Sequence, residues 1–405
     1  MDSPLQTELL AKEYRSLTRL YEVFERWLLL KDPYLLEVVL ASVVANLLGG
    51  DPLWLLIVAP PSSAKTEIIR ALSRVPCIYL LSNLTANTLL SGQKGKKDAS
   101  LLPHLSNKIL AMKDFTTILT LHRDARAEIF AQLREVYDGS YSKAYGTGEQ
   151  KRWEGRVGFL AGVTQVIDGQ QAVHTILGER FLLYRPETEA RQEIARKALR
   201  NRGTEAQMRK ELAEAVEGFM ASLEKVEDRT GEIPQEVEDI IVLLADLTAK
   251  GRAGVPRDGY DRQIQYTPDP ETPARLAKQL ALLGTGLAVV KGKIGVGTDE
   301  LAVLRKVATA TMIQQRVKVV RALAKLHSWE WAETQAVMDE TTIPARTCKE
   351  LLEDCWVLKL VERDREGDED SDVGRRGQKP YKWKLSSEYR DDLQLAGIFE
   401  ENVPF

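Results

Sequence analysis

The stretch WLLIVAPPSSAKTEIIRALS, residues 54–73, combines an apolar run, a short turn and a Lys-Thr pair that opens a helical pattern. A phosphate-binding loop uses this order, because its lysine reaches the β- and γ-phosphates and its hydroxyl contacts Mg²⁺. Lys65 and Thr66 match these two roles. Both glycines of the G-x-x-x-x-G-K-[ST] pattern are alanine here, Ala59 and Ala64. Taken alone, the loop therefore fits an ordinary strand–turn–helix as well as a nucleotide site.

Three further apolar runs follow at residues 77–82, 107–115 and 157–164, with helical patterns such as residues 125–137 between them. Short unbroken apolar runs are typical of parallel strands buried on both faces. Their alternation with helices predicts the α/β class, with an open parallel sheet and helices on its faces.

The composition and apolar periodicity of the chain change at several points, and these changes predict its division into domains. We expect an N-terminal helical segment over residues 1–48, an α/β core with the phosphate-binding loop over 49–186 and a helical region with an insertion over 187–314, which the resemblance described below implies to be a lid. Three short helices and two strands then predict a winged helix over 315–392, followed by a tail over 393–405.

Composition narrows the class of protein. The 405 residues carry a net charge of −3, so a nucleic-acid contact must come from local patches and not from a general basic excess. Three scattered cysteines and four histidines argue against a disulfide framework or a zinc site. No apolar run is long enough to span a bilayer and the first residues are too polar for a signal peptide, so we expect a reducing cytoplasm and no membrane partner.

Polar residues at the ends of the later runs complete a possible nucleotide site. Asp114 ends the run 107–115, where a carboxylate would hold Mg²⁺, although a strand-end cap is the simpler alternative. The next residue is Phe115, where a glutamate would polarise the attacking water. Thr164 ends the run 157–164 and would act as a polar sensor. An exposed Arg180 would reach the γ-phosphate of a neighbouring subunit, or else form a surface ion pair.

Four stretches resemble the AAA+ ATPases, and among them the minichromosome-maintenance helicases and their shorter relatives on phages and mobile elements. These stretches are NLLGGDP, APPSSAKTE, SNLTANTL and ERFLLYR, within a resemblance that covers residues 36–310. The resemblance implies an αβα core with a helical lid, ATP and Mg²⁺ as ligands, and ring-forming homo-oligomers, commonly hexamers, with ATP between subunits.

The resemblance also assigns roles to individual residues. It implies that Arg275 contacts the γ-phosphate, unless it is only a helix-surface charge, and that Thr66 and Asp114 hold Mg²⁺. It implies a nucleotide-binding loop made of Pro60, Pro61, Ser62, Ser63, Ala64, Lys65, Thr66 and Glu67. Ala59, Phe115 and the missing N-terminal DNA-binding domain depart from the family, and Glu128 or Glu135 would have to replace the glutamate as catalytic base.

Two basic segments suggest contacts with DNA. Residues 141–158 occupy the place of a channel hairpin in the family and carry Lys143, Lys151 and Arg152 among aromatic residues, although an ordinary exposed hairpin is the alternative. The winged helix would place its third helix in the major groove and its wing near the phosphates, unless it binds a protein. Its candidate contacts are Arg346, Lys349, Arg375, Arg376 and Lys379.

The sequence therefore predicts an ATP-binding AAA+ protein that hydrolyses ATP and acts on DNA. It would be a helicase, translocase or remodeller in the replication of a phage or mobile element. One alternative is a DNA-bound nucleotide switch that hydrolyses little, which the missing glycines and glutamate favour. Another is a winged-helix transcription regulator with a structural α/β domain.

Overall fold

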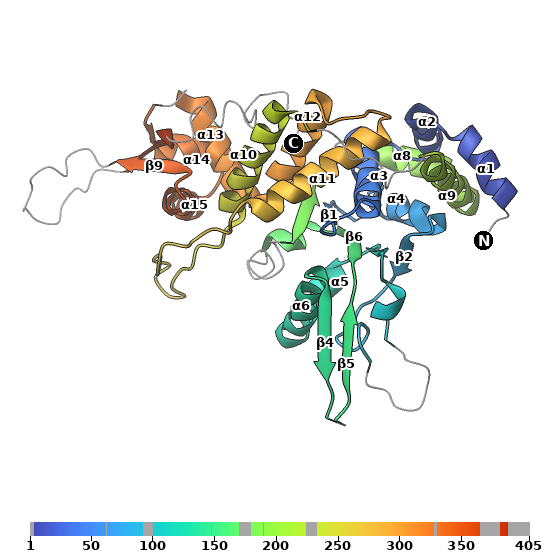
Figure 1. The fold of residues 1–405 in the computed structure, drawn as a ribbon. Coiled ribbons are helices and arrows are strands. Elements are labelled where there is room, and N and C mark those ends of the chain that lie inside the picture. Colours follow the sequence, from blue (N-terminus) through green and yellow to red (C-terminus); the bar gives the residue numbers. More distant parts are fainter. Residues whose placement is uncertain are drawn as a thin grey trace, which may run out of the picture.

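The computed structural model describes residues 4–61, 63–91, 100–146, 148–169, 180–188, 190–223, 233–327, 330–364 and 381–387. A parallel sheet lies at the centre, a hairpin extends from one side of it, and helices continue in both directions from the core (Figure 1). Across these ranges, no helix combines the length and apolar character that crossing a bilayer requires.

Five parallel strands form the central sheet in the order β2-β3-β6-β1-β7. Their bounds are β1 (Trp54–Val58), β2 (Ile78–Leu81), β3 (Lys108–Met112), β6 (Val157–Val163) and β7 (Phe181–Tyr184). The α/β class with a parallel sheet is thus confirmed, and four of the strands lie in the predicted apolar runs. The sequence does not single out β7, because four apolar residues are too few to show a period.

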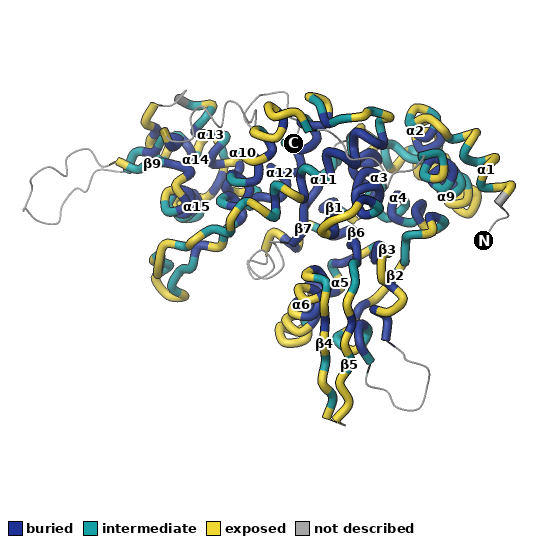
Figure 2. The backbone as a smooth tube through the Cα atoms, in the orientation of Figure 1, coloured by how far each residue is buried: buried dark blue, intermediate teal, exposed yellow. Residues whose placement is uncertain are grey.

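Alternate residues of each strand point to opposite faces, and both faces are covered. On one face, Leu55, Ile57 and Leu160 pack into a core shared with α3, α4, α11 and α12. On the other, Trp54 and Phe159 pack with α5 and α6. The helices are α3 (Tyr34–Leu47), α4 (Lys65–Ala71), α5 (Thr116–Leu119), α6 (Arg123–Tyr137), α11 (Ala274–Val290) and α12 (Thr298–Thr311). Burial is accordingly concentrated in the sheet and in α3 (Figure 2).

Helix α3 is the most buried helix of the core, and α11 crosses it at very short range. A Cβ built on Gly286 of α11 would lie 2.4 Å from the Ala41 carbonyl oxygen of α3. This close approach requires glycine at position 286. It fixes the lid helices onto the core.

The predicted lid, residues 187–314, contributes helices to two separate groups (Figure 1). Helices α8 (Arg191–Arg200) and α9 (Glu205–Ser222) lie with α1 (Pro4–Glu13) and α2 (Leu17–Trp27), while α10 (Gln235–Arg252) packs with α11 and α12. The indole N–H of Trp27 donates to Glu211 of α9 over 2.8 Å. The N-terminal segment is therefore built into the fold by α9.

Strands β4 (Ser140–Ala144) and β5 (Gln150–Glu154) form an antiparallel hairpin that projects away from the sheet (Figure 1). Tyr141 and Trp153 are opposite each other and buried near its base. This hairpin occupies most of the range where the sequence predicts one.

The C-terminal unit, defined here as the described residues from 314 to 387, contains three helices and three short strands. The helices are α13 (Gln314–His327), α14 (Thr334–Thr341) and α15 (Ala345–Val357). The strands β8 (Ala332–Glu333), β10 (Lys382–Leu385) and β9 (Val361–Asp364) pair in that order and are antiparallel. Three helices and two strands thus lie where the sequence predicts them, β8 adds a third strand to the sheet, and Trp383 is at its buried centre.

Candidate nucleotide site

The loop between β1 and α4 is held against the carboxyl end of the sheet. The Ala59 N–H donates to the Val163 carbonyl oxygen of β6 over 3.0 Å. The Lys65 ammonium donates to the carbonyl oxygens of Ala59 (2.5 Å) and Pro60 (3.0 Å), and the residue is only 4% exposed. The lysine side chain therefore lies underneath the loop, at the edge where parallel α/β sheets bind ligands.

The two alanines that replace the glycines do not strain this loop. Ala64 has φ −59° and ψ −14°, in the right-handed helical region, and Ala59 is not among the described residues with positive φ. Since glycine is required only for positive φ or a very close approach, alanine fits both positions.

A glycine that the sequence-based prediction overlooks makes room for Lys65. A Cβ on Gly162 of β6 would lie 2.8 Å from the Lys113 carbonyl oxygen and 3.3 Å from Cδ of Lys65. Gly162 thus lets β3, β6 and the lysine side chain approach one another. A glycine within a buried strand is a recognisable signal for such an approach.

The predicted acidic and polar residues meet at the same edge. Asp114 follows β3, and its Oδ1 accepts the Thr116 N–H over 2.9 Å. The Thr116 hydroxyl accepts the Thr164 N–H (3.0 Å) and donates to the Thr164 hydroxyl oxygen (3.3 Å). Because β6 lies between β1 and β3, Thr164 lies between the loop of Lys65 and Asp114. The strand order thus assembles three residues that are widely separated in sequence.

The charges of Lys65 and Asp114 act on each other without forming an ion pair. Burial lowers the pKa of the Lys65 ammonium below its usual value, and the Asp114 carboxylate partly opposes that shift. No ion pair of Lys65 occurs within the described ranges. The two groups are therefore close but still separate.

Phe115 points away from this site. Its ring is fully buried, with its centroid 5.6 Å from that of Phe159 and 6.1 Å from that of Phe181. A glutamate with this side-chain direction would lie among aromatic rings. Glu128 lies 3.5 Å from Lys143 of the hairpin, and Glu135 is exposed on α6.

A cavity of about 560 Å³ opens beside the loop, a size typical of ligand pockets. Its walls are Leu29, Leu30, Lys31, Asp32, Leu35, Pro60, Pro61, Ser63, Ala64, Pro186, Glu187, Thr188, Arg191, Ile194, Ala195 and Ala198. The Ser63 hydroxyl is buried and has no hydrogen-bond partner in the described part of the chain. The cavity therefore combines apolar wall residues with four charged ones (Lys31, Asp32, Glu187 and Arg191) and an unsatisfied hydroxyl in the loop.

Thr66 and Glu67 differ in whether their side chains are available to a ligand. Thr66 is half-buried at the start of α4, whereas Glu67 is held by Arg70 (2.8 Å) and by Arg209 of α9 (3.1 Å). The Glu67 carboxylate thus ties α4 to α9. Ser62 lies outside the described residues.

Ion pairs close the far side of the cavity. Lys31 lies 2.9 Å from Glu193 of α8. Asp32 accepts the Tyr184 hydroxyl (2.8 Å) and the Lys306 ammonium (2.8 Å), and all three side chains are buried. Burial, together with the Asp32 charge, raises the pKa of the Tyr184 phenol. These contacts fix the segment 29–35 to the end of β7 and to α12.

Arg180 is not the exposed arginine that the sequence predicts. Its side chain is 6% exposed and forms a 2.7 Å ion pair with Asp138. It directly precedes β7, whose first residue pairs with Trp54, the first residue of β1. Arg180 therefore lies at the amino edge of the sheet, roughly 16 Å of strand away from the carboxyl edge.

Arg275 lies at this same amino edge. Its guanidinium is 5.8 Å from the ring centroid of Tyr137, and that of Arg180 is 5.6 Å from the same ring. One turn along α11, Lys278 pairs with Asp51 in the turn before β1 over 3.4 Å. Both predicted phosphate-contacting arginines thus lie opposite the loop of their own chain.

The basic residues of the hairpin are partly committed to contacts within the chain. Lys143 donates to the Ala86 carbonyl oxygen (3.1 Å), and Lys151 donates to that of Ser91 (2.7 Å). Arg152 is exposed and pairs with Glu154 over 2.5 Å. Of the three, Arg152 presents the most accessible positive charge.

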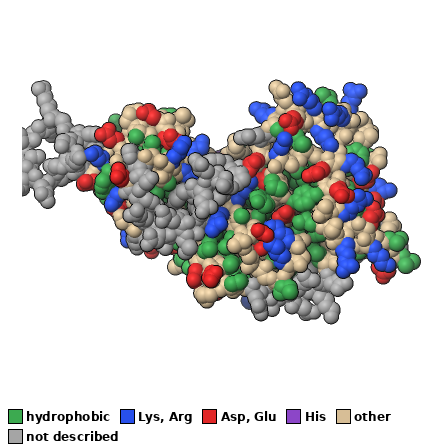
Figure 3. All heavy atoms as spheres, turned by 90° about the horizontal axis from the view of Figure 1, so that it is seen from above, with side chains coloured by type: hydrophobic (Ala, Val, Ile, Leu, Met, Phe, Trp, Pro, Cys, Tyr) green, Lys and Arg blue, Asp and Glu red, His purple; other side chains and the backbone are tan. Residues whose placement is uncertain are grey.

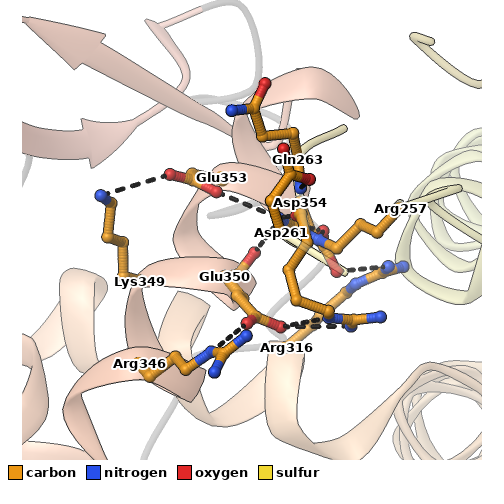
Figure 4. A network of polar contacts seen from close by, with 10 residues as sticks. Arg257, Asp261, Gln263, Arg316, Arg346, Lys349, Glu350, Glu353 and Asp354 are labelled. Carbon is orange, nitrogen blue, oxygen red and sulfur yellow. Dashed lines mark hydrogen bonds and ion pairs between the residues drawn. The ribbon is translucent and has the colours of Figure 1, made fainter. Parts of the chain in front are cut away.

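Helix α15 carries an acidic face that two arginines of a distant loop cover (Figure 4). Arg257, between α10 and α11, contacts Glu353 (3.1 Å) and Asp354 (2.8 Å). Arg262 contacts Glu350 over 3.2 Å. Arg316 of α13 contacts Asp354 over 3.0 Å. This charge network joins the C-terminal unit to the lid.

The predicted DNA contacts of α15 lie on the margin of that network. Arg346 is 3.1 Å from Glu350, and Lys349 is 3.9 Å from Glu353, each four residues apart on the helix. Both side chains remain largely exposed, and such surface pairs are weak. Arg375, Arg376 and Lys379 lie outside the described residues. On the face seen in Figure 3, basic and acidic side chains intermingle and form no continuous basic patch.

No protein-family model matches the chain, and no curated protein sequence matches it.

Proposed function

We propose that the chain binds ATP–Mg²⁺ at the carboxyl edge of its sheet and hydrolyses it, as an AAA+-like ATPase. One observation carries this proposal. Lys65, Asp114 and Thr164 follow three neighbouring strands at one edge of the sheet. A cavity of about 560 Å³ opens beside the loop 60–64 that leads into Lys65. The carboxyl edge is the ligand-binding edge of an open α/β sheet.

Each residue at this edge has a distinct part in the proposal. Lys65 would exchange its two carbonyl acceptors for the β- and γ-phosphates, and the unsatisfied Ser63 hydroxyl would donate to a phosphate oxygen. Thr66 and Asp114 supply hard oxygen ligands that suit Mg²⁺. Mg²⁺, when bound, would neutralise phosphate charge. Apolar wall residues of the cavity, such as Leu29, Leu35 and Ile194, suit the base.

The position of the two arginines supports a homo-oligomer. Arg180 and Arg275 lie at the edge opposite their own loop, so a phosphate that they contact belongs to another copy of the chain. Arg180 would have to exchange its pairing with Asp138 for that phosphate. A ring brings such edges together repeatedly, and the resemblance to AAA+ ATPases favours a ring.

DNA is the proposed macromolecular partner. The projecting hairpin with exposed Arg152 and the winged-helix arrangement of the C-terminal unit support this part of the proposal. The hairpin projects away from the sheet and is therefore the first candidate surface, with α15 as the second.

The deciding experiment compares ATP binding and turnover, with and without DNA, in the wild type and in Lys65→Ala. Loss of two charge-assisted hydrogen bonds to phosphate should cost about 4 kcal/mol, on the order of a thousandfold in affinity. Lys12→Ala, at an exposed lysine of α1, is the control and should match the wild type. Wild-type protein that binds no ATP would overturn the proposal.

A nucleotide switch with little hydrolysis is the second candidate, and the direction of Phe115 favours it. No carboxylate follows Asp114 on the site side of β3. A single-turnover measurement separates the two functions. Bound ATP that persists intact, even with DNA, indicates a switch, while DNA-stimulated conversion to ADP indicates a motor.

A further inference from the structure

Thr116 connects the two strand ends that carry the catalytic candidates. Its backbone N–H holds Oδ1 of Asp114 (2.9 Å), and its hydroxyl forms two hydrogen bonds with Thr164 (3.0 and 3.3 Å). The sequence-based prediction assigns it no role, although it is only two residues from Asp114.

The direction of these hydrogen bonds determines which donor and acceptor atoms of Thr164 and Asp114 remain available to a ligand. The Thr116 hydroxyl accepts from the Thr164 backbone and donates to the Thr164 hydroxyl oxygen. The Thr164 hydroxyl then has its own proton free to donate outward, and a chain of hydrogen bonds strengthens that donor. Oδ1 of Asp114 is restrained by the Thr116 N–H, and Oδ2 accepts no hydrogen bond from the described residues. The outward-facing donor and acceptor are thus both set by Thr116.

The inward direction of the Phe115 side chain accounts for the position of Thr116 at the site. The Phe115 ring is anchored in the aromatic core, and its N–H donates to the Gly162 carbonyl oxygen over 2.7 Å. With the residue after Asp114 turned inward, the following residue is the first that can return to the site. Thr116 occupies that place at the start of α5.

We propose that Thr116 is a positioning residue that aims the Thr164 hydroxyl at the γ-phosphate position and holds it in register with Asp114. This inference rests on the proposed nucleotide function and adds the Thr116–Thr164 hydroxyl pair to it. Because Thr116 acts through Thr164, its effect should be confined to states with a γ-phosphate or its mimic.

The test uses the full-length chain with Thr116→Val, Thr116→Ser and the control Thr120→Val. Among the described residues, the Thr120 hydroxyl donates only to the carbonyl oxygens of Thr116 and Thr117 in α5, so the control removes a nearby hydroxyl with local contacts. Affinities for ADP and for ADP–aluminium fluoride, both with Mg²⁺, are measured by calorimetry, and kcat and KM for ATP are measured in parallel.

We expect Thr116→Val to weaken ADP–aluminium fluoride binding about tenfold and to leave ADP affinity within about twofold. The value of kcat should fall about tenfold at nearly constant KM, and Thr116→Ser should restore both quantities. If valine prevents folding, Thr116→Ala gives the same readouts.

Several results would overturn the inference. Equal losses in Thr116→Val and Thr120→Val, or equal losses for ADP and the fluoride complex, indicate a merely structural role. A wild type that binds both ligands equally has no γ-phosphate contact for Thr116 to organise. Failure of the proposed function is distinct, because then the wild type binds neither ligand in a Lys65-dependent way.

Discussion

The carboxyl edge of the sheet and the acidic face of α15 both carry charged side chains, but these side chains have different bonding partners in the two regions. At the sheet edge, Lys65 is bonded to carbonyl oxygens and Asp114 to a backbone N–H. On α15, Asp354 accepts two arginines, and Glu350 and Glu353 each pair with arginine as well. Charges are thus kept apart in one region and neutralised in the other.

This difference distinguishes a ligand site from a structural connection. We call the connection the joint: the ion pairs of Glu350, Glu353 and Asp354 on α15 with Arg257, Arg262 and Arg316. Paired charges at short range satisfy one another and hold two segments together, and removing one partner exposes the other to an unfavourable environment. Groups that are bonded only to the backbone can exchange those bonds for a ligand. The sheet edge therefore fits the proposed ligand site, whereas the ion pairs of α15 connect the C-terminal unit to the lid.

The largest expected effect on stability comes from removing the carboxylate of Asp354 from the joint. Asp354→Ala leaves buried Arg257 and Arg316 without their shared carboxylate and should lower the free energy of unfolding by about 3 kcal/mol. Chemical denaturation measures this change. Asp339→Ala, at an exposed residue of α14 in the same unit, should change it by less than about 0.5 kcal/mol. Similar losses of unfolding free energy in both variants would show that Asp354 contributes no more to stability than an exposed surface residue.

A smaller effect should follow from filling the space behind Lys65. In Gly162→Ala the new methyl group meets the Lys113 carbonyl oxygen and the lysine side chain, at 2.8 and 3.3 Å. Displacing Lys65 should weaken ATP binding about tenfold, or about 1.4 kcal/mol. Gly49→Ala is the control, because a Cβ there has no neighbour within 4 Å. Unchanged ATP affinity in Gly162→Ala would mean that the packing of Lys65 does not matter for binding.

The smallest expected effect is a pH dependence of the joint. Burial raises the pKa of Glu350, but hydrogen bonds from Arg346 and Arg262 outweigh it and leave the pKa below its usual value of 4.5. A depressed pKa stabilises the fold fully above the unfolded value, and this contribution is lost as pH falls through the folded value. The stability difference between the wild type and Glu350→Gln should therefore be constant near pH 7 and shrink below about pH 4.5.

Denaturation midpoints at pH 7 and pH 3.5 measure this difference. Glu8→Gln, at an exposed residue of α1, serves as the control for the loss of a carboxylate. A difference that stays constant over the whole range would show that Glu350 is not an energetic part of the joint.

The sequence predicts the sheet and the principal residues of the site because both follow from local pattern. Apolar runs of strand length identify β1, β3 and β6. The turn and Lys-Thr pair after β1 mark Lys65, and polar residues at the ends of β3 and β6 mark Asp114 and Thr164. Parallel strands end at a common edge, so predicting the strands already brings these residues to one side of the sheet.

Other parts of the site depend on contacts that no local pattern contains. The cavity is closed by segments 29–35 and 186–198, and the acidic face of α15 is paired with arginines about ninety residues earlier in the chain. The pattern likewise does not tell whether Phe115 points to the site or to the core, or whether Arg180 is exposed.

The sequence by itself thus determined the α/β class, the loop with its lysine, and the acidic and polar strand ends. The tertiary structure alone decided that the two alanines fit the loop, that Thr116 joins Asp114 to Thr164, and that Arg180 and Arg275 lie at the opposite edge. The physical reason is the distance along the chain over which each interaction acts. Periodicity and turns act over a few residues, whereas strand order and packing choose partners across the whole chain.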